Sequence, residues 1–299
     1  MVEIESNPSE TDPVEESRMT LGEHLDELRR RLVRATVAIL VIFCISWAFR
    51  NTLDGWAQRP YHQARLRLNP IIAESAQEAV AEDSEVWEKW YTREPEQGEA
   101  LPPLKESWLV PERMKGDTGG MGFIYLMKVC LYFSLFFGGP ILLWEMWQFI
   151  AAGLYKNERK VVRMYFPFSA ALFVGGVVFG YFVMVPNALY FLALQTITSI
   201  QWYQSVGSYW TFLLSLTLAL GAVFQLPVIM MALAKLDLVT PKTFARYRGH
   251  MLIAALLVSA IITPPDPVTQ LLMAVPIAIL YEVGIWIGRA VHKPSAPKE

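Results

Sequence analysis

The sequence predicts an all-α membrane protein with six transmembrane helices, and three observations carry this prediction. Of the 299 residues, 54% are hydrophobic and only 18% are charged, whereas soluble chains carry about 25% charged residues. From Met164 to Ala234 the chain contains no Asp, Glu, Lys, Arg or His, and this run holds two spans of about 20 residues each. Lysines and arginines gather in alternate connections between the apolar segments, as in cytoplasmic loops.

The six spans follow from the apolar segments in chain order. We place them near residues 32–49, 123–148, 164–188, 208–234, 251–262 and 268–288. The last two are short, because the fifth has fewer residues than a bilayer requires and Glu282 interrupts the sixth. Prolines lie inside four of the spans: Pro140, Pro167, Pro186, Pro227 and Pro276. Since proline removes a helical hydrogen bond, we expect kinked helices around a concave face.

The charge of the connections predicts the orientation. Four segments carry lysine or arginine: 1–34, 151–163, 235–250 and the tail from Arg289. The two short connections on the opposite side, 189–207 and 263–267, carry neither. Both termini are therefore predicted to be cytoplasmic. The first outside connection, residues 50–120, is too long for this rule, and its tryptophans favour an amphipathic helix on the bilayer surface.

The chain therefore divides into a tail, a membrane domain and a second tail. Residues 1–19 are acidic and contain prolines, which favours a disordered tail and excludes a signal peptide. The membrane domain covers residues 20–290 with the outside loop 50–120, and residues 291–299 form a cytoplasmic tail.

Composition and motifs also exclude several functions. A net charge of −2 provides no basic field for nucleic acid, and no GxxxxGK[ST] motif is present to bind ATP. We find no metal-ligand spacing among His, Cys, Asp and Glu, and no paired acid–base or nucleophile constellation. We therefore expect neither an enzyme nor a bound metal or cofactor.

A short amphipathic helix is predicted just before the first span. Thr20 and Glu23 fit the capping-box pattern, so a helix begins there. One face carries leucines at helical spacing, which we expect at the membrane interface or against another helix: Leu21, Leu25, Leu28 and Leu32. Another face is polar: His24, Glu27, Arg31 and Arg34.

Two carboxylates on the cytoplasmic side each allow two interpretations. Glu27 either pairs with Arg30 or Arg31 along its own helix, worth about 0.2–0.5 kcal/mol, or it is a docking carboxylate for a cationic ligand. The helical pattern leaves these nearly even. Glu158 is either a solvated loop charge balanced by Lys156 and Arg159 or part of the same docking site.

Several short motifs, in order along the chain, resemble those of the TatC family, the multispanning subunit of the twin-arginine protein translocase. They are HLDELRRRL at 24–32, WQFIAAGLYKNER at 147–159, FQLP at 224–227, TPPD at 263–266 and Tyr281-Glu282 before a glycine. Pro60 matches a proline that the family has after its first span. The family often has Glu where this chain has Gln225, which removes an ionisable group from the membrane interior and leaves a hydrogen-bonding or water-recruiting role.

The resemblance implies a receptor for signal peptides with consecutive arginines, and the core of a translocase that exports folded proteins. It assigns Glu27 and Glu158 to the arginine pair, with Arg29, Phe149 and Tyr155 in the same motifs. It also implies small single-span partners of the TatA and TatB type around Gln225, and a homo-oligomer within a hetero-complex. The location that it implies is the bacterial plasma (inner) membrane, and the energy source is the proton-motive force. Carboxylates suit this task because a guanidinium fork binds them bidentately, whereas lysine offers a point charge.

Polar residues inside the spans have structural alternatives. Gln225 is either functional or makes an interhelical hydrogen bond worth about 0.6 kcal/mol. Glu145 lies near the cytoplasmic end of its span and is expected to reach the interface. Asp266 either caps the outside hairpin or contacts a partner. The main alternative function is a secondary transporter of a small solute, which requires a midplane site and internal repeats that the sequence does not show.

Overall fold

A computed structural model describes residues 21–82, 90–92, 103–105, 109–112, 114, 121–153, 159–195, 205–263 and 266–292. In this part of the chain, five helical segments are long and apolar enough to cross a membrane: Gly22–Ala48, Gly122–Ala152, Met164–Leu194, Val206–Lys235 and Pro267–Val291. Of the two spans predicted to be short, the fifth forms the shorter helix α11 (Arg248–Ile262) of 15 residues. The prediction is wrong for the sixth, because its helix runs over 25 residues through Glu282. The all-α class is confirmed, whereas the count of six spans stays a prediction.

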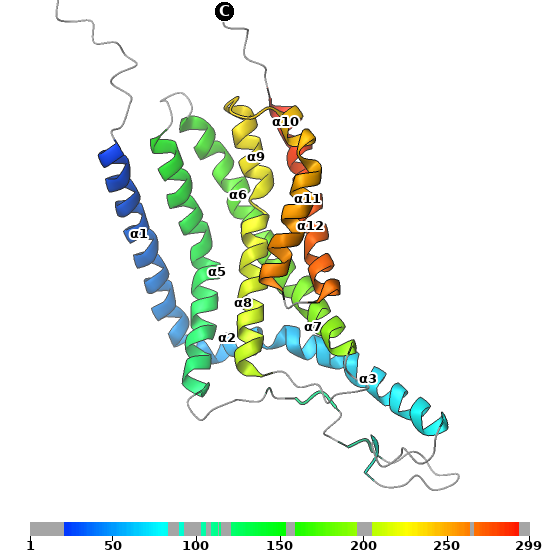
Figure 1. Cartoon of the computed structure of the whole chain (residues 1–299). Helices are drawn as coiled ribbons and strands as arrows, with labels where there is room; N and C mark the ends of the chain where they lie inside the picture. The colour runs from blue at the N-terminus through cyan, green and yellow to red at the C-terminus, as the bar shows by residue number, and fades with distance from the viewer. Residues whose placement is uncertain are drawn as a thin grey trace, which may run out of the picture.

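The long helices stand side by side in one bundle (Figure 1). Helix α1 (Leu21–Ala48) packs on α5 (Met121–Ala152), which packs in turn on α6 (Arg159–Phe179). The third span continues through η3 (Gly180–Met184) into α7 (Val185–Leu194). The fourth consists of α8 (Val206–Val223) and α9 (Leu226–Lys235). The start of α1 and the end of α12 (Pro267–Val291) lie at the same end of the bundle, together with α10 (Pro241–Arg246).

The outside connection forms two helices, α2 (Arg50–Ala57) and α3 (Arg59–Glu82), that run across the opposite end of the bundle (Figure 1). One face of this segment is buried at spacings of three and four residues: Ala57, Tyr61, Ala64, Leu68, Ile72 and Ala76. These side chains belong to the main core, which also contains Leu189 of α7 and Tyr209 of α8. The sequence predicted an amphipathic helix on the bilayer surface, but its apolar face packs against the bundle. Pro60 is buried in the first turn of α3, where a proline costs no hydrogen bond.

Two of the five span prolines interrupt their helix. Pro186 has no N–H to donate to the carbonyl of Phe182, and the helix widens there into the π-helix η3. Pro227 follows the break between α8 and α9. Pro140, Pro167 and Pro276 lie inside continuous helices. A local change of the helix at the expected proline kinks is therefore seen in the third and fourth spans.

Candidate functional site

The polar face of α1 is the one that meets α5. Its apolar stripe points away from the bundle, because Leu25, Leu28 and Leu32 are 64%, 41% and 61% exposed. The sequence predicts this stripe either at the membrane interface or against another helix. In the part of the chain that the structure describes, no helix covers it, so the second prediction is wrong there. Packing of a polar face between two helices requires charge pairing, and the side chains of α1 and α5 provide it.

Four charged side chains form an alternating network across this contact. Glu27 binds the Arg31 guanidinium one turn further along α1. Arg31 Nη1 also lies 3.2 Å from Glu145 Oε2 on α5, and Arg34 Nη1 lies 3.7 Å from the other oxygen of Glu145. The side chains of Glu27, Arg31 and Glu145 are only 17%, 14% and 12% exposed. The pairing of Glu27 with Arg31 is confirmed, and the guanidinium sits between two carboxylates.

Glu145 is the residue that sequence reasoning missed. The sequence predicts that it reaches the membrane interface, whereas the structure shows that its side chain is largely buried and pairs with Arg31 and Arg34. A usable signal was present, since Glu145 lies one helical turn before Phe149 and therefore on the same face of α5. Only the packing of α1 against that face identifies its partners.

The contact extends beyond the charges through an aromatic pair. The rings of His24 and Phe149 stack with centroids 4.3 Å apart. A Cβ added at Gly153, just past the end of α5, would lie 3.5 Å from Cε1 of His24. Gly153 therefore lies beside the start of α1. Glu158 and Tyr155 belong to the connection after α5 and lie outside the described residues.

Arg29 does not join this network. It is exposed on a different side of α1, where it lines a shallow surface with Asp26, Arg30 and Arg34. Of the five residues expected to bind a signal peptide, the structure thus brings Glu27 and Phe149 to one contact and places Arg29 around the helix from them.

Gln225 lies at the break in the fourth span and is buried, with 4% of its surface exposed. Ser169 of α6 donates its hydroxyl to Oε1 of Gln225 and accepts a hydrogen bond from Trp147 Nε1 at 2.9 Å. The amide nitrogen of Gln225 donates to the carbonyl of Ser169 at 3.2 Å. The interhelical hydrogen bond considered from the sequence is therefore present, and it links α5, α6 and the α8–α9 break.

Asp266 caps α12. Its carboxylate accepts hydrogen bonds from the backbone N–H groups of Val268 and Thr269 and from the Thr269 hydroxyl, and Gln195 at the end of α7 donates to it at 2.7 Å. Burial raises the pKa of the Asp266 carboxyl, but these hydrogen bonds outweigh burial and hold the pKa below its ordinary value. The structural turn role is confirmed.

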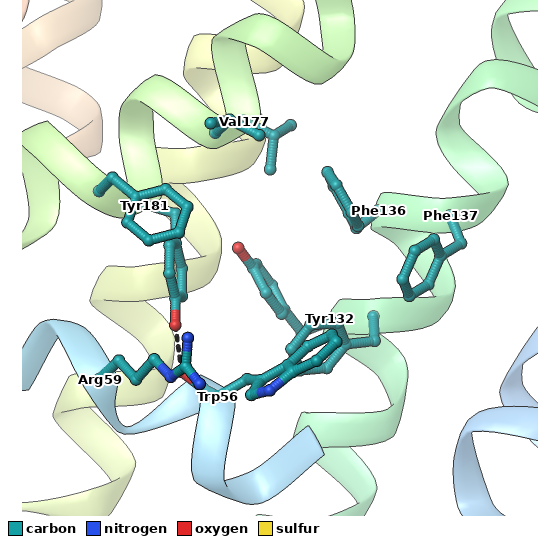
Figure 2. A pocket seen from close by; sticks show the side chains of 10 residues that line it. Trp56, Arg59, Tyr132, Phe136, Phe137, Val177 and Tyr181 are labelled. Carbon is teal, nitrogen blue, oxygen red and sulfur yellow. Dashed lines mark hydrogen bonds between the residues drawn. The ribbon is translucent and has the colours of Figure 1, made fainter. Parts of the chain in front are cut away.

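A pocket of about 260 Å³ lies between α2, α5 and the third span (Figure 2). Aromatic and aliphatic side chains form its wall, among them Tyr132, Phe136 and Val177, and Arg59 is the one charged residue among the described residues that line it. Figure 2 shows the Tyr181 hydroxyl bound to the backbone carbonyl of Trp56 beside Arg59. A transporter for a polar solute needs several converging polar groups at such a site, so this pocket gives the alternative function no support.

Comparison with known proteins assigns the chain to a family. A sequence model of the Sec-independent protein translocase protein TatC matches residues 23–276. The chain belongs to the TatC family. It is thus a membrane subunit of the Sec-independent, twin-arginine protein translocase.

Relatives from several bacteria support this assignment over nearly the whole chain. The TatC protein of Halothiobacillus neapolitanus is 33% identical over 98% of this chain and 70% of its own length. That of Escherichia coli K12 is 30% identical over 92% of this chain and 90% of its own length. A crystal structure of the twin arginine translocase receptor TatC superposes with a TM-score of 0.63 at 26% identity, covering 90% of this chain and 99% of that one.

Proposed function

We propose that this chain is the receptor subunit that recognises signal peptides with consecutive arginines and begins the export of folded proteins. One observation carries the proposal: Glu27 already holds an arginine guanidinium in a partly buried site at the α1–α5 contact. A site that binds a guanidinium within the chain has the charge and geometry to bind one from a ligand. The solved relative is itself named a receptor.

Glu158 supplies the second carboxylate in this proposal. It follows Gly153 by five residues, and Gly153 lies beside His24 on α1. A connection this short keeps Glu158 within reach of the α1–α5 contact. Phe149 and Tyr155 then provide apolar and aromatic contacts to the signal peptide, and Arg29 contributes from another side of α1.

The two carboxylates account for only part of the affinity. Hydrogen bonds to charged groups contribute about 1.5–3 kcal/mol each, so two of them give at most about 6 kcal/mol, which corresponds to tens of micromolar. The hydrophobic stretch of the signal peptide supplies the rest. We propose that TatA- and TatB-type single-span subunits join at the fourth and fifth spans around Gln225, with several copies of the chain in one inner-membrane complex.

Binding of a synthetic signal peptide to the purified chain tests the receptor role. Peptides with Arg-Arg and Lys-Lys are compared by titration. Glu27→Ala and Glu158→Ala should each weaken the Arg-Arg peptide about ten- to hundredfold. Asp26→Ala is the matched control, because Asp26 is exposed and adjacent to Glu27 on another side of α1. Equal affinity of the wild-type chain for both peptides would refute the proposal.

A further inference from the structure

Arg31 occupies the position that an incoming arginine would need. Its guanidinium binds Glu27 through Nη2 and lies 3.2 Å from Glu145 through Nη1. Its Nε is buried and has no hydrogen-bond partner in the part of the chain that the structure describes. One donor of the fork is therefore unused, although both neighbouring carboxylates accept several hydrogen bonds.

We propose that Arg31 is an internal stand-in for a signal-peptide arginine, and that Glu145 receives Arg31 when the signal peptide takes Glu27. This inference rests on the proposed receptor function. It assigns Glu145 as a positioning residue, which acts through Arg31 and does not touch the ligand.

The exchange conserves hydrogen bonds. When Arg31 leaves Glu27, it gives up the contact of Nη2, while Nε becomes free to turn toward Glu145. A side-on pair of Nε and one Nη with a carboxylate is a strong bidentate geometry for arginine. The incoming guanidinium meanwhile replaces Arg31 on Glu27, so each buried charge keeps an opposite partner throughout.

Glu145 is essential to this exchange because of burial. The Arg31 side chain is only 14% exposed. Leaving its buried guanidinium without a carboxylate would cost free energy, because the charge would be neither hydrated nor paired. With a neutral side chain at position 145, Arg31 has one carboxylate left and holds Glu27 more firmly. Arg34 does not replace Glu145, because it is a cation and is itself 58% exposed.

The stand-in lowers the apparent affinity of every ligand by the same factor, because any ligand must compete with a guanidinium that already sits on Glu27. The preference for arginine over lysine comes from the carboxylate itself, since an ammonium group offers a point charge without the planar fork and is more strongly hydrated. Removal of Arg31 should therefore tighten Lys-Lys and Arg-Arg peptides by about the same factor.

The test is a double-mutant cycle on the purified full-length chain with the Arg-Arg and Lys-Lys peptides. We expect Arg31→Gln to tighten Arg-Arg binding about tenfold and Glu145→Gln to weaken it about tenfold. In the Arg31→Gln background, Glu145→Gln should have no effect, because no guanidinium remains to be received. Arg31→Lys should lie between wild type and Arg31→Gln.

The control is Glu282→Gln, which removes a carboxylate paired with Arg248 on α11, away from this contact, and should leave affinity unchanged. If Glu27→Gln abolishes binding but Arg31→Gln weakens it, or if Glu145→Gln has the same effect in both backgrounds, the stand-in is refuted while the receptor function survives. If Glu27→Gln leaves wild-type affinity intact, the receptor site itself is wrong.

Discussion

Ser169 joins two side chains that the sequence places on different spans. Its hydroxyl accepts from Trp147 Nε1 and donates to Gln225, and all three residues are buried. A buried polar group that loses its partner retains the full cost of its desolvation. Gln225, which the sequence singled out as a polar residue inside a span, therefore stabilises the contact of three helices through its bond with Ser169.

Ser169→Ala should lower the free energy of unfolding by about 1–3 kcal/mol, because both the indole N–H and the Gln225 oxygen lose a partner. Thermal unfolding in detergent measures the effect. Ser134→Ala is the matched control, since the equally buried Ser134 donates to the carbonyl of Leu131 in its own helix and, among the residues that the structure describes, links no second helix. An equal loss in both variants would show that the three-helix link contributes nothing.

Asp266 makes the outside hairpin sensitive to acid. Its folded pKa is lowered, so its contribution is complete above the unfolded value of about 4 and is lost as the pH falls through that value toward the folded pKa. The melting temperature should therefore fall on acidification below about pH 4 by more in the wild type than in Asp266→Asn. Asparagine keeps the cap but does not titrate in this range. Identical pH profiles of the two proteins would contradict this account.

At the scale of the element, glycines allow α6 to approach α8 closely. A Cβ at Gly176 would lie 2.8 Å from the carbonyl oxygen of Leu220, so the two helices would have to separate. Small residues allow this kind of backbone approach between membrane helices. The close contact also places Ser169 of α6 within reach of Gln225.

Gly176→Ala should destabilise the bundle by about 1–3 kcal/mol, since an added methyl overpacks the helix contact. Gly175→Ala is the neighbouring control, because its Cβ would have nothing within 4 Å, and alanine improves helix propensity by up to about 1 kcal/mol. Thermal unfolding in detergent compares the stabilities of the two variants. A larger loss in Gly175→Ala than in Gly176→Ala would show that the close approach of α6 and α8 is wrong.

For the whole molecule, the decisive prediction is orientation. In a chain whose own Cys44 and Cys130 are replaced, Ser205→Cys should react with an impermeant maleimide only from outside, and Leu238→Cys only from the cytoplasmic side. Ser205 precedes α8 and the exposed Leu238 follows α9, so the two positions bracket the fourth span. Reaction of both from one side would mean that α8 and α9 do not together cross the membrane, and the six-span prediction would fail.

The sequence by itself determined the all-α membrane class, the position of the apolar helices and the residues of the α1 polar face. Those features depend on composition and on helical spacing, which are local properties of the chain. Pairing of Glu27 with Arg30 or Arg31 was one of its two interpretations of Glu27, since residues three and four apart on a helix are neighbours, and the structure has the pair with Arg31.

Only the tertiary structure decided which helix meets that polar face, and hence that Glu145 pairs with Arg31 across 114 positions of sequence. It likewise decided that the outside helix packs on the bundle and that Gln225 faces Ser169. Periodicity shows which residues share a face of a helix but does not identify the surface that packs against this face. The packing partner depends on all the helices together, because a buried charge must find an opposite charge on a neighbouring helix.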